Sequence, residues 1–383
     1  MVVGFFWGDA EGTRRRGGAE GWRGGGIDVV FYLWDMKLRI DVLARICEIP
    51  GVPGHEQAVT AYLKAQLSPY ISHFHVDGMG NLTCTIPGKS DQSIMVAAHM
   101  DEIGFMVTHI EPQGSLRITP LGGFDPKTLT AQRVWVHGKK DVLGVMGSKP
   151  IHIMDAEERN KAPKISDFFI DLGLPYEEVI QLVSIGDVVT RERDLVQMGP
   201  CVNAKSLDNR VSVYVLMETL IALAEKPLPF TFHGVFTVQE EVGIRGAQAA
   251  ALRLNPHFGL GLDTTIAYDV PGAAAHEQVT SLGKGVAIKW MDASAIAHPS
   301  MVKYLKSRAI ERQIPWQPEI LTAGGTDTAA IQRFNPGGAI TGALSIPTRH
   351  IHQVIEMCHT TDIEAAIDLL SDSILHLDAF PQS

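Results

Sequence analysis

The chain has 383 residues, of which 45% are hydrophobic and 20% are charged. These proportions are typical of a globular protein with a sizeable core, long enough for one large domain and a smaller one. The formal net charge of -10 argues against nucleic acid as a partner, because phosphate-binding surfaces depend on clustered Lys and Arg. No apolar stretch reaches the roughly 20 residues that cross a bilayer, so no membrane partner is expected either.

The four cysteines are far apart in the sequence, at positions 47, 84, 201 and 358. They have neither the close spacing of a zinc knuckle nor the density of a secreted disulfide scaffold. We therefore expect a reducing, cytoplasmic setting.

Residues 1–35 differ from the rest of the chain. The stretch EGTRRRGGAEGWRGGG mixes Gly with Arg and has no apolar periodicity, and only the short run VVFYLW follows it. A secretory signal needs a basic start, about 7–15 apolar residues and a small-residue cleavage site, and that order is not found. We predict a disordered leader or an extension of the reading frame, with folding beginning near Met36.

The folded part is predicted to open with helices in LRIDVLARICEI and EQAVTAYLKAQLSPY, because apolar residues recur there at helical spacing. The apolar run SIMVAAH then predicts a strand that is covered on both faces and ends at His99. We assign residues 36–104 to the first part of a catalytic domain.

Residues 105–193 change in character. Short alternating runs such as RVWVHG and DVLGVMGS are separated by Gly, Pro and Asp turns, with one helical patch near ISDFFIDLG. Short strands at regular intervals predict a small β-rich barrel or sandwich inserted into a larger fold.

Residues 194–383 return to alternating helices and strands, as in VSVYVLMETLIALAEK, FTFHGVFTVQ, RGAQAAALRL and FGLGLDTT. This alternation implies crossover connections and a mainly parallel sheet. The predicted fold class is α/β: a mainly parallel mixed sheet flanked by helices, with the barrel-like β-rich domain inserted into it.

Acids and imidazoles follow the predicted strands, at the sheet edge where α/β proteins place functional groups. They are His99, Asp101, Glu240, Glu241 and Asp263, joined by Asp208 in the loop before a long helix and by His350 and His352 in a short strand-like segment near the C-terminus. Taken singly, each could be a turn former, a helix cap or a half-buried polar residue. Gathered at one edge, they would repel one another unless a cation held them.

Two-metal hydrolases explain this mixture of residues. A pair of divalent ions needs a bridging carboxylate, further imidazole and carboxylate ligands, and an open position for water. Asp208 suits the bridge. Asp101 lies two residues after His99 on an extended chain, so the two side chains point the same way and Asp101 can orient the imidazole.

Glu240 and Glu241 are adjacent, and neighbouring side chains on a regular strand face opposite sides. Both can enter one pocket only if the strand has ended or bulged there, which Gly243 and Gly246 favour. One glutamate would then bind the metal, and the other would act as general base. The alternative interpretation is two solvated glutamates at a helix start.

Six motifs, in this order and spacing, resemble the M42 family of metallo-aminopeptidases, including the tetrahedral aminopeptidases: AAHMDEIGFMV, AKSLDNR, TVQEEVGIRGA, GLDTT, AGGTDTAAIQ and SIPTRHIHQVIEM. The resemblance runs from about Met36 to the C-terminus. It implies a cytosolic exopeptidase that removes N-terminal residues from short peptides with two divalent ions per subunit. Zinc, cobalt and manganese all suit imidazole plus carboxylate ligands.

The resemblance also implies roles for individual residues. His99 and Asp263 would bind one ion, Glu241 and His352 would bind the other, and Asp208 would bridge the two.

Four further positions would support the reaction. Glu240 would be the general base and Asp101 the partner of His99, while Gly325 and Asp327 would line or support the substrate side. Asn209 stands where relatives often have Asp, which affects only a contact behind the bridging carboxylate.

In the family fold, the small β-rich domain interrupts the catalytic domain and mediates dimerisation. Similar members form hollow tetrahedral dodecamers built from dimers, so the expected partners are peptide substrates and further copies of the chain. The preferred N-terminal residue is not predicted, because single pocket substitutions can change selectivity.

Two other functions use similar residues. Relatives labelled as glucanases suggest glycoside hydrolysis, but its two carboxyl groups must flank a sugar from separate positions, which adjacent glutamates do not do. A metal-stabilised scaffold protein would have its coordination saturated by protein ligands, and the extra glutamate argues against that.

Overall fold

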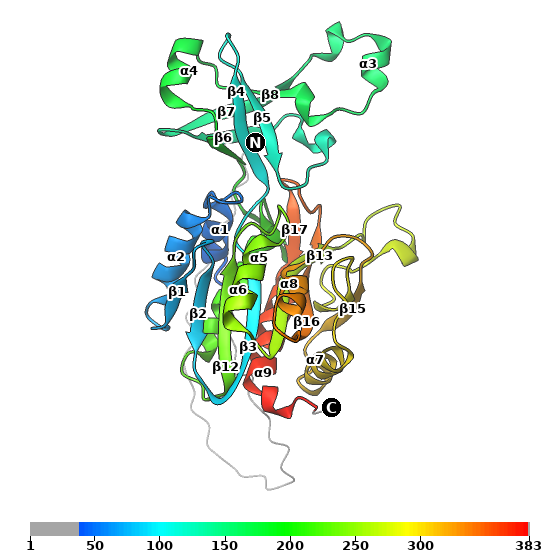
Figure 1. Ribbon diagram of the computed structural model, residues 1–383. Helices are drawn as coiled ribbons and strands as arrows, with labels where there is room; N and C mark the ends of the chain where they lie inside the picture. Colours follow the sequence, from blue (N-terminus) through cyan, green and yellow to red (C-terminus); the bar gives the residue numbers. More distant parts are fainter. Residues whose placement is uncertain (1–37, 382–383) are drawn as a thin grey trace, which may run out of the picture. The chain divides into compact units, whose positions relative to one another are not determined.

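The computed structural model describes residues 38–381, and the predicted leader at residues 1–35 lies outside them. A large mixed sheet flanked by helices and a small closed barrel make up the described chain (Figure 1). The predicted fold class is confirmed.

Two helices open the described chain, as the apolar spacing predicts. Helix α1 spans Ile40–Glu48 and helix α2 spans Gln57–Leu67. Val59, Leu63 and Leu67 are buried at intervals of four residues, so α2 presents one apolar stripe to the core.

The main sheet has the strand order β1-β2-β12-β3-β13-β16-β17-β11-β10, with β14 paired to β15 and β16. Its central strands β12, β3, β13 and β16 run parallel, and the pairs outside them are antiparallel except β14 with β15. The strand bounds are β1 Phe74–Val76, β2 Leu82–Ile86, β3 Gly88–His99, β10 Val196–Met198, β11 Cys201–Ala204, β12 Leu228–Thr237, β13 Phe258–Ile266, β14 Val286–Met291, β15 Trp316–Ile320, β16 Ile340–Arg349 and β17 Glu356–His359.

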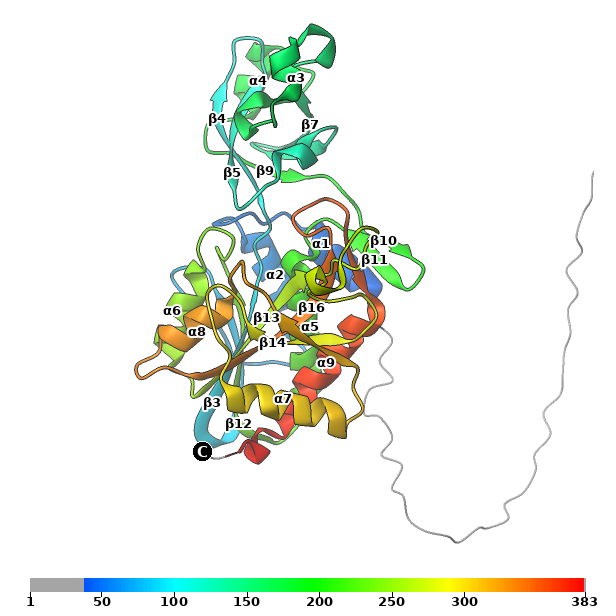
Figure 2. The same cartoon turned by 90° about the vertical axis from the view of Figure 1, so that its right-hand side faces the viewer.

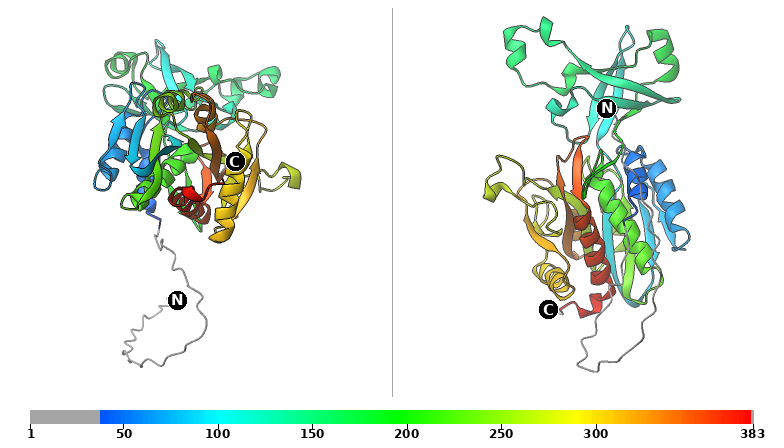
Figure 3. Two further views of the ribbon diagram at one scale, coloured as in Figure 1. Left: turned by 60° about the horizontal axis from the view of Figure 1, so that its bottom comes forward. Right: turned by 180° about the vertical axis from the view of Figure 1, so that it is seen from behind.

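Helices cover both faces of this sheet, because the central strands are apolar on both sides. On β3, Ile94 and Val96 belong to the large core under α5 (Leu207–Leu223) and α9 (Thr360–Leu375). Met95, between them, faces the second core under α6 (Arg245–Leu254) and α8 (Asp327–Arg333). Figure 1 shows α6 and α8 in front of the sheet, and the rear view in Figure 3 shows α5 and α9 side by side. Helix α7 (Pro299–Glu311) packs beside α9.

The barrel (Figure 2) closes in the order β4-β5-β8-β7-β6-β9. It has its own apolar core. Its strands are β4 Gly104–Ile110, β5 Leu116–Leu121, β6 Arg133–His137, β7 Asp141–Ser148, β8 Phe168–Asp171 and β9 Val188–Arg191. The helical patch predicted near ISDFFIDLG is present only as the 3-10 turn Ile165–Asp167. It is wrong for the residues that follow, because Phe168 and Ile170 face the barrel core as part of β8. Short helices lie on either side of it, α3 at Ala156–Asn160 and α4 at Tyr176–Leu182.

Among the helices of residues 38–381, none combines the length and the apolar character that a membrane span requires.

Candidate active site

The carboxyl ends of the central strands supply one half of the site. Strand β3 ends at His99, which pairs in register with Thr237, the last residue of β12. Asp263 lies near the end of β13, the other neighbour of β3. Because parallel strands end at the same sheet edge, the three chain segments bring their polar groups together.

Asp208 lies between two imidazoles. One of its carboxylate oxygens, Oδ1, is 3.5 Å from Nε2 of His99, and the other, Oδ2, is 3.3 Å from Nε2 of His352. The backbone at Asp208 departs from helical φ/ψ at the start of α5, and the side chain is nearly buried. Each oxygen of one carboxylate therefore faces a different histidine.

Two groups of candidate metal ligands result. His99, Asp208 and Asp263 form one group, and Asp208, Glu241 and His352 form the other, with the donor atoms of each group within 4.8 Å of one another. Imidazole nitrogens with carboxylate oxygens are the donor set of catalytic zinc and related divalent ions. The residues present therefore fit a pair of metal ions, and Asp208 belongs to both groups.

The electrostatics of the cluster favour added positive charge. Burial acts to lower the pKa of His99, but the facing carboxylates of Asp101, Asp208 and Asp263 outweigh it and raise that pKa well above its ordinary value. Burial also acts to lower the pKa of His352, but Asp208 and Glu241 outweigh it and raise that pKa to about 11. The imidazoles thus hold protons in the place where a cation would neutralise the acids.

The acids show the complementary effect. Burial and the neighbouring charge of Asp263 raise the pKa of Glu240 well above its usual range, and burial also raises the pKa of Glu241 and of Asp263. Asp208 is the exception, since the two imidazoles outweigh its burial and lower its pKa. A cation would relieve the cost of ionising the remaining carboxylates.

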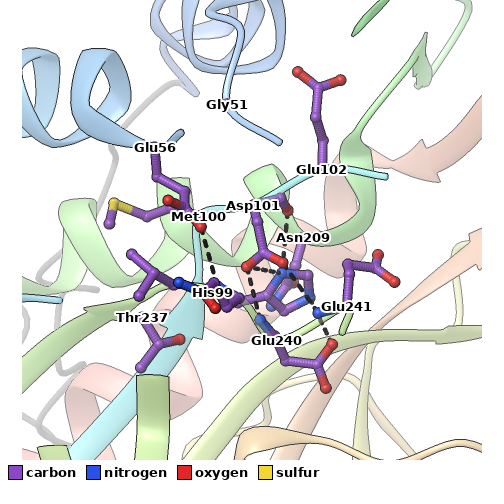
Figure 4. Close-up of polar contacts among 12 residues, drawn as sticks. Gly51, Glu56, His99, Met100, Asp101, Glu102, Asn209, Thr237, Glu240 and Glu241 are labelled. Carbon is purple, nitrogen blue, oxygen red and sulfur yellow. Dashed lines mark hydrogen bonds and ion pairs between the residues drawn. The ribbon is translucent and has the colours of Figure 1, made fainter. Parts of the chain in front are cut away.

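The adjacent glutamates both reach the site because the strand has ended before them. Strand β12 stops at Thr237, and Gln239 has a φ of 56°. The two carboxylate oxygens of Asp101 then accept hydrogen bonds from the backbone N–H groups of Glu240 and Glu241, each at 3.0 Å (Figure 4). The alternative of two solvated glutamates is wrong, because their side chains are only 11% and 6% exposed.

Asp101 has a less direct contact with His99 than its spacing predicts. Nδ1 of His99 lies 3.2 Å from the backbone carbonyl oxygen of Asp101 and 3.5 Å from its carboxylate oxygen Oδ1. The carboxylate is instead occupied by the two glutamate amides. It therefore positions the glutamate pair as well as lying beside the imidazole.

His352 lies in a loop, whereas the sequence pattern predicts a strand-like segment around it. Strand β16 ends at Arg349, and both His350 and His352 have positive φ, at 60° and 66°. That backbone conformation cannot continue a strand. His350 lines the neighbouring cavity but belongs to neither group of candidate ligands.

A cavity of about 730 Å³ opens beside the two groups. Gly325 lines it, together with apolar side chains such as Ile244, Val270 and Leu321. Asp327 lies deeper: it is 2% exposed and accepts a hydrogen bond from the Thr237 hydroxyl at the end of β12. The two weaker candidates thus occupy different places, one on the cavity wall and one in the structure that supports it.

Three further residues contact the backbone of the site. The sequence predicts no role for Glu356 and Arg191, and for Asn209 it predicts only a contact behind the bridging carboxylate. Glu356 accepts hydrogen bonds from the backbone of Asp208 and His352, and Arg191 donates one to the His352 carbonyl. Asn209 donates from Nδ2 to the carbonyl oxygen of Leu262, directly before Asp263. Glu356 lies inside the quoted motif SIPTRHIHQVIEM, but no signal in the sequence connects Arg191 to it.

Comparison with known proteins identifies the family of the chain. The family model described as M42 glutamyl aminopeptidase matches residues 80–369. A protein of Acetivibrio thermocellus that carries an aminopeptidase name is 38% identical over 335 residues, which cover 87% of this chain and 98% of that protein.

Solved structures give the same result. The TET aminopeptidase of Thaumarchaeota archaeon SCGC AB-539-E09 is 35% identical with a TM-score of 0.86, over 89% of this chain and 96% of that chain. The TET1 peptidase of Pyrococcus horikoshii, which can assemble into a tetrahedron or a large octahedral shell, is 30% identical with a TM-score of 0.79, over 88% of this chain and 99% of that chain.

A structure described as an endoglucanase, from Thermotoga maritima, is more distant, at 27% identity and a TM-score of 0.73 over 87% of this chain and 96% of that chain. The family model and the aminopeptidase relatives therefore outweigh the glucanase label. The chain belongs to the M42 family of aminopeptidases.

Proposed function

We propose that this aminopeptidase removes N-terminal residues from short peptides by di-metal hydrolysis, with Glu240 as general base. The observation that carries the proposal is the placement of Asp208, whose two oxygens face His99 and His352 at 3.5 and 3.3 Å. A carboxylate between two imidazoles is what a bridged pair of ions requires.

Five residues would hold the ions: His99 and Asp263 on one side, Glu241 and His352 on the other, and Asp208 between them. When bound, zinc, cobalt or manganese would supply Lewis acidity for the scissile carbonyl and lower the pKa of water.

Glu240 supports the proposal by being close to the ligands without belonging to either group. Its Oε2 lies 3.9 Å from Nε2 of His99. Burial and the neighbouring acids raise its pKa, so the carboxylate has a strong tendency to take up a proton. It would accept the proton of the attacking water and deliver it to the nitrogen of the leaving amine. Asp101 fixes the backbone that carries this carboxylate.

Replacing each glutamate by Gln, one at a time, tests the division of roles. Glu240→Gln removes the base and should lower kcat by about 10²–10⁴-fold, while two equivalents of metal still bind. Glu241→Gln, as the matched control, should weaken metal binding before it affects turnover at saturating metal. Activity is measured on aminoacyl chromogenic substrates and metal content by isothermal titration. A fully active Glu240→Gln enzyme would contradict the assignment, and a metal-independent glucanase activity would support the alternative function.

We also propose that the chain, divided at residues 36–104, 105–193 and 194–383, forms a homo-oligomer, a dodecamer built from dimers that pair through the inserted barrel. Large aliphatic side chains are exposed in that insert, with Ile151 at 62%, Ile153 at 68% and Ile185 at 67%. Exposed apolar surface of this kind is a common feature of interfaces.

Light scattering on a paired substitution tests the assembly. Ile151→Asp with Ile153→Asp should reduce the particle mass, because two charges would be buried at the interface. Ile310→Asp, at a 59% exposed position on α7, is the matched control and should leave the mass unchanged. An unchanged mass in the double variant would contradict pairing through this surface.

A further inference from the structure

The peptide unit of His352 is held at both its polar ends. Its backbone N–H donates to Oε1 of Glu356 at 2.8 Å, and its carbonyl oxygen accepts from Nη1 of Arg191 at 2.9 Å. The residue has a φ of 66°. A positive φ is unfavourable for a residue other than Gly, and contacts with the surrounding structure maintain it. These two hydrogen bonds are contacts that impose it.

Arg191 is the last residue of β9, so this contact comes from the barrel. The side chain is buried, and its guanidinium lies over the ring of Phe124 at 5.4 Å from the centroid. Phe124 in turn stacks on Phe105 of β4, with ring centroids 4.4 Å apart. Because the barrel core fixes these two rings, it also fixes the donor that reaches His352.

A second barrel segment approaches the same half of the site. The turn after β5 passes so close that a Cβ at Gly123 would lie 3.6 Å from Nδ1 of His352, and one at Gly122 would lie 3.4 Å from Cβ of Glu241. His99 and Asp263, by contrast, lie in strands of the main sheet.

Glu356 connects this half of the site to the shared carboxylate. It is 1% exposed, at the start of β17, and its Oε2 accepts the backbone N–H of Asp208 at 2.9 Å. One buried carboxylate therefore holds the backbones of both Asp208 and His352. Outer contacts of this kind orient metal ligands, and their loss typically costs about 10–100-fold in metal affinity or activity.

We propose that Arg191 and Glu356 are positioning residues that hold His352 towards Asp208 and Glu241, so that the inserted barrel completes the catalytic site. The inference rests on the proposed two-metal function and adds to it the residues on which one half of the centre depends. A purely structural role would stabilise the attachment of the barrel without any preference between the two groups of ligands.

Cobalt(II) titration of the full-length protein, after chelation, separates these two roles. Visible absorption follows the uptake of each equivalent, and isothermal titration gives both affinities. Arg191→Met keeps the packing on Phe124 but removes the donor, so it should weaken one equivalent by about 10–100-fold and leave the other within about threefold. Arg191→Lys, which retains a donor, should recover part of the loss. Arg193→Met, at an exposed arginine two residues further on, is the matched control and should bind as the unmodified chain does.

Glu356→Gln places an amide N–H₂ against one of two backbone N–H groups and should weaken the same equivalent, with a spectral change at the bridging ligand as well. Glu218→Gln is its control. Glu218 is also a buried carboxylate, but it accepts a hydrogen bond from Arg39, which is not a candidate ligand. Thermal unfolding and the retained tight equivalent show that each variant is folded.

Two results would overturn the inference: both equivalents binding to Arg191→Met as they bind to the unmodified chain, or both weakening equally. An unmodified chain that takes up fewer than two equivalents would instead overturn the proposed function, and this distinguishes the two failures.

Discussion

The two halves of the candidate site are built differently. His99 is 2% exposed and lies at the end of a central strand, next to Asp263 on the neighbouring strand. The side chain of His352 is 35% exposed and belongs to a loop with positive φ at His350 and His352. Parallel strands place ligands at a sheet edge without further support, whereas a loop ligand needs contacts from outside. Arg191 and Glu356 provide these contacts.

Asp208 belongs to both groups of candidate ligands, so its replacement should have the largest effect. Asp208→Ala removes an oxygen from each group of ligands and should abolish tight binding of both equivalents. Activity should fall by more than the roughly 100-fold that loss of an outer contact costs. Isothermal titration and turnover at saturating metal measure the two effects. Retention of one tight equivalent would show that Asp208 is not shared.

The two histidines should differ in how far they can be replaced from solution. His99→Ala and His352→Ala should each lose one equivalent of metal. Added imidazole should raise the activity of His352→Ala, because the side chain that it replaces is 35% exposed where it borders the cavity. His99→Ala should respond less, because His99 is only 2% exposed although it lines the same cavity. Equal rescue of both variants, measured as turnover against imidazole concentration, would contradict the difference between the halves.

The sequence predicted the sheet-borne half of the site more completely than the loop-borne half. Periodicity and strand ends locate His99 and Asp263, and the helices α1 and α2 follow from apolar spacing. The loop at His350 and His352 was predicted as strand-like, because its positive φ values depend on contacts that no local pattern shows. Arg191 is separated from His352 by 161 residues, so only the fold brings them together.

Buried acids beside the site should make the metal-free protein sensitive to pH. Burial raises the pKa of Glu56 and of Asp327 to about 7, from ordinary values of 4.5 and 3.8. The protonated forms of both groups stabilise the folded protein. This stabilisation is complete below the ordinary pKa values and is lost as the pH rises through about 7, so the free energy of unfolding should fall between pH 5 and pH 8. The slope should be on the order of 1 kcal/mol per pH unit and per group.

Thermal unfolding of the chelated protein measures this effect. Asp327→Asn should flatten the pH dependence, because the amide cannot ionise, and Asp91→Asn, at an exposed position, should not. A melting temperature that stays constant or rises between pH 5 and pH 8 would contradict the expected sign.

Anomalous scattering from crystals grown with zinc, recorded above and below its absorption edge, tests the central claim most directly. The account predicts two peaks, one at each oxygen of Asp208: the first between His99 and Asp263, and the second between Glu241 and His352. In Arg191→Met crystals the first peak should keep its height and the second should weaken. A single peak in the unmodified protein, or two peaks away from Asp208, would contradict the account.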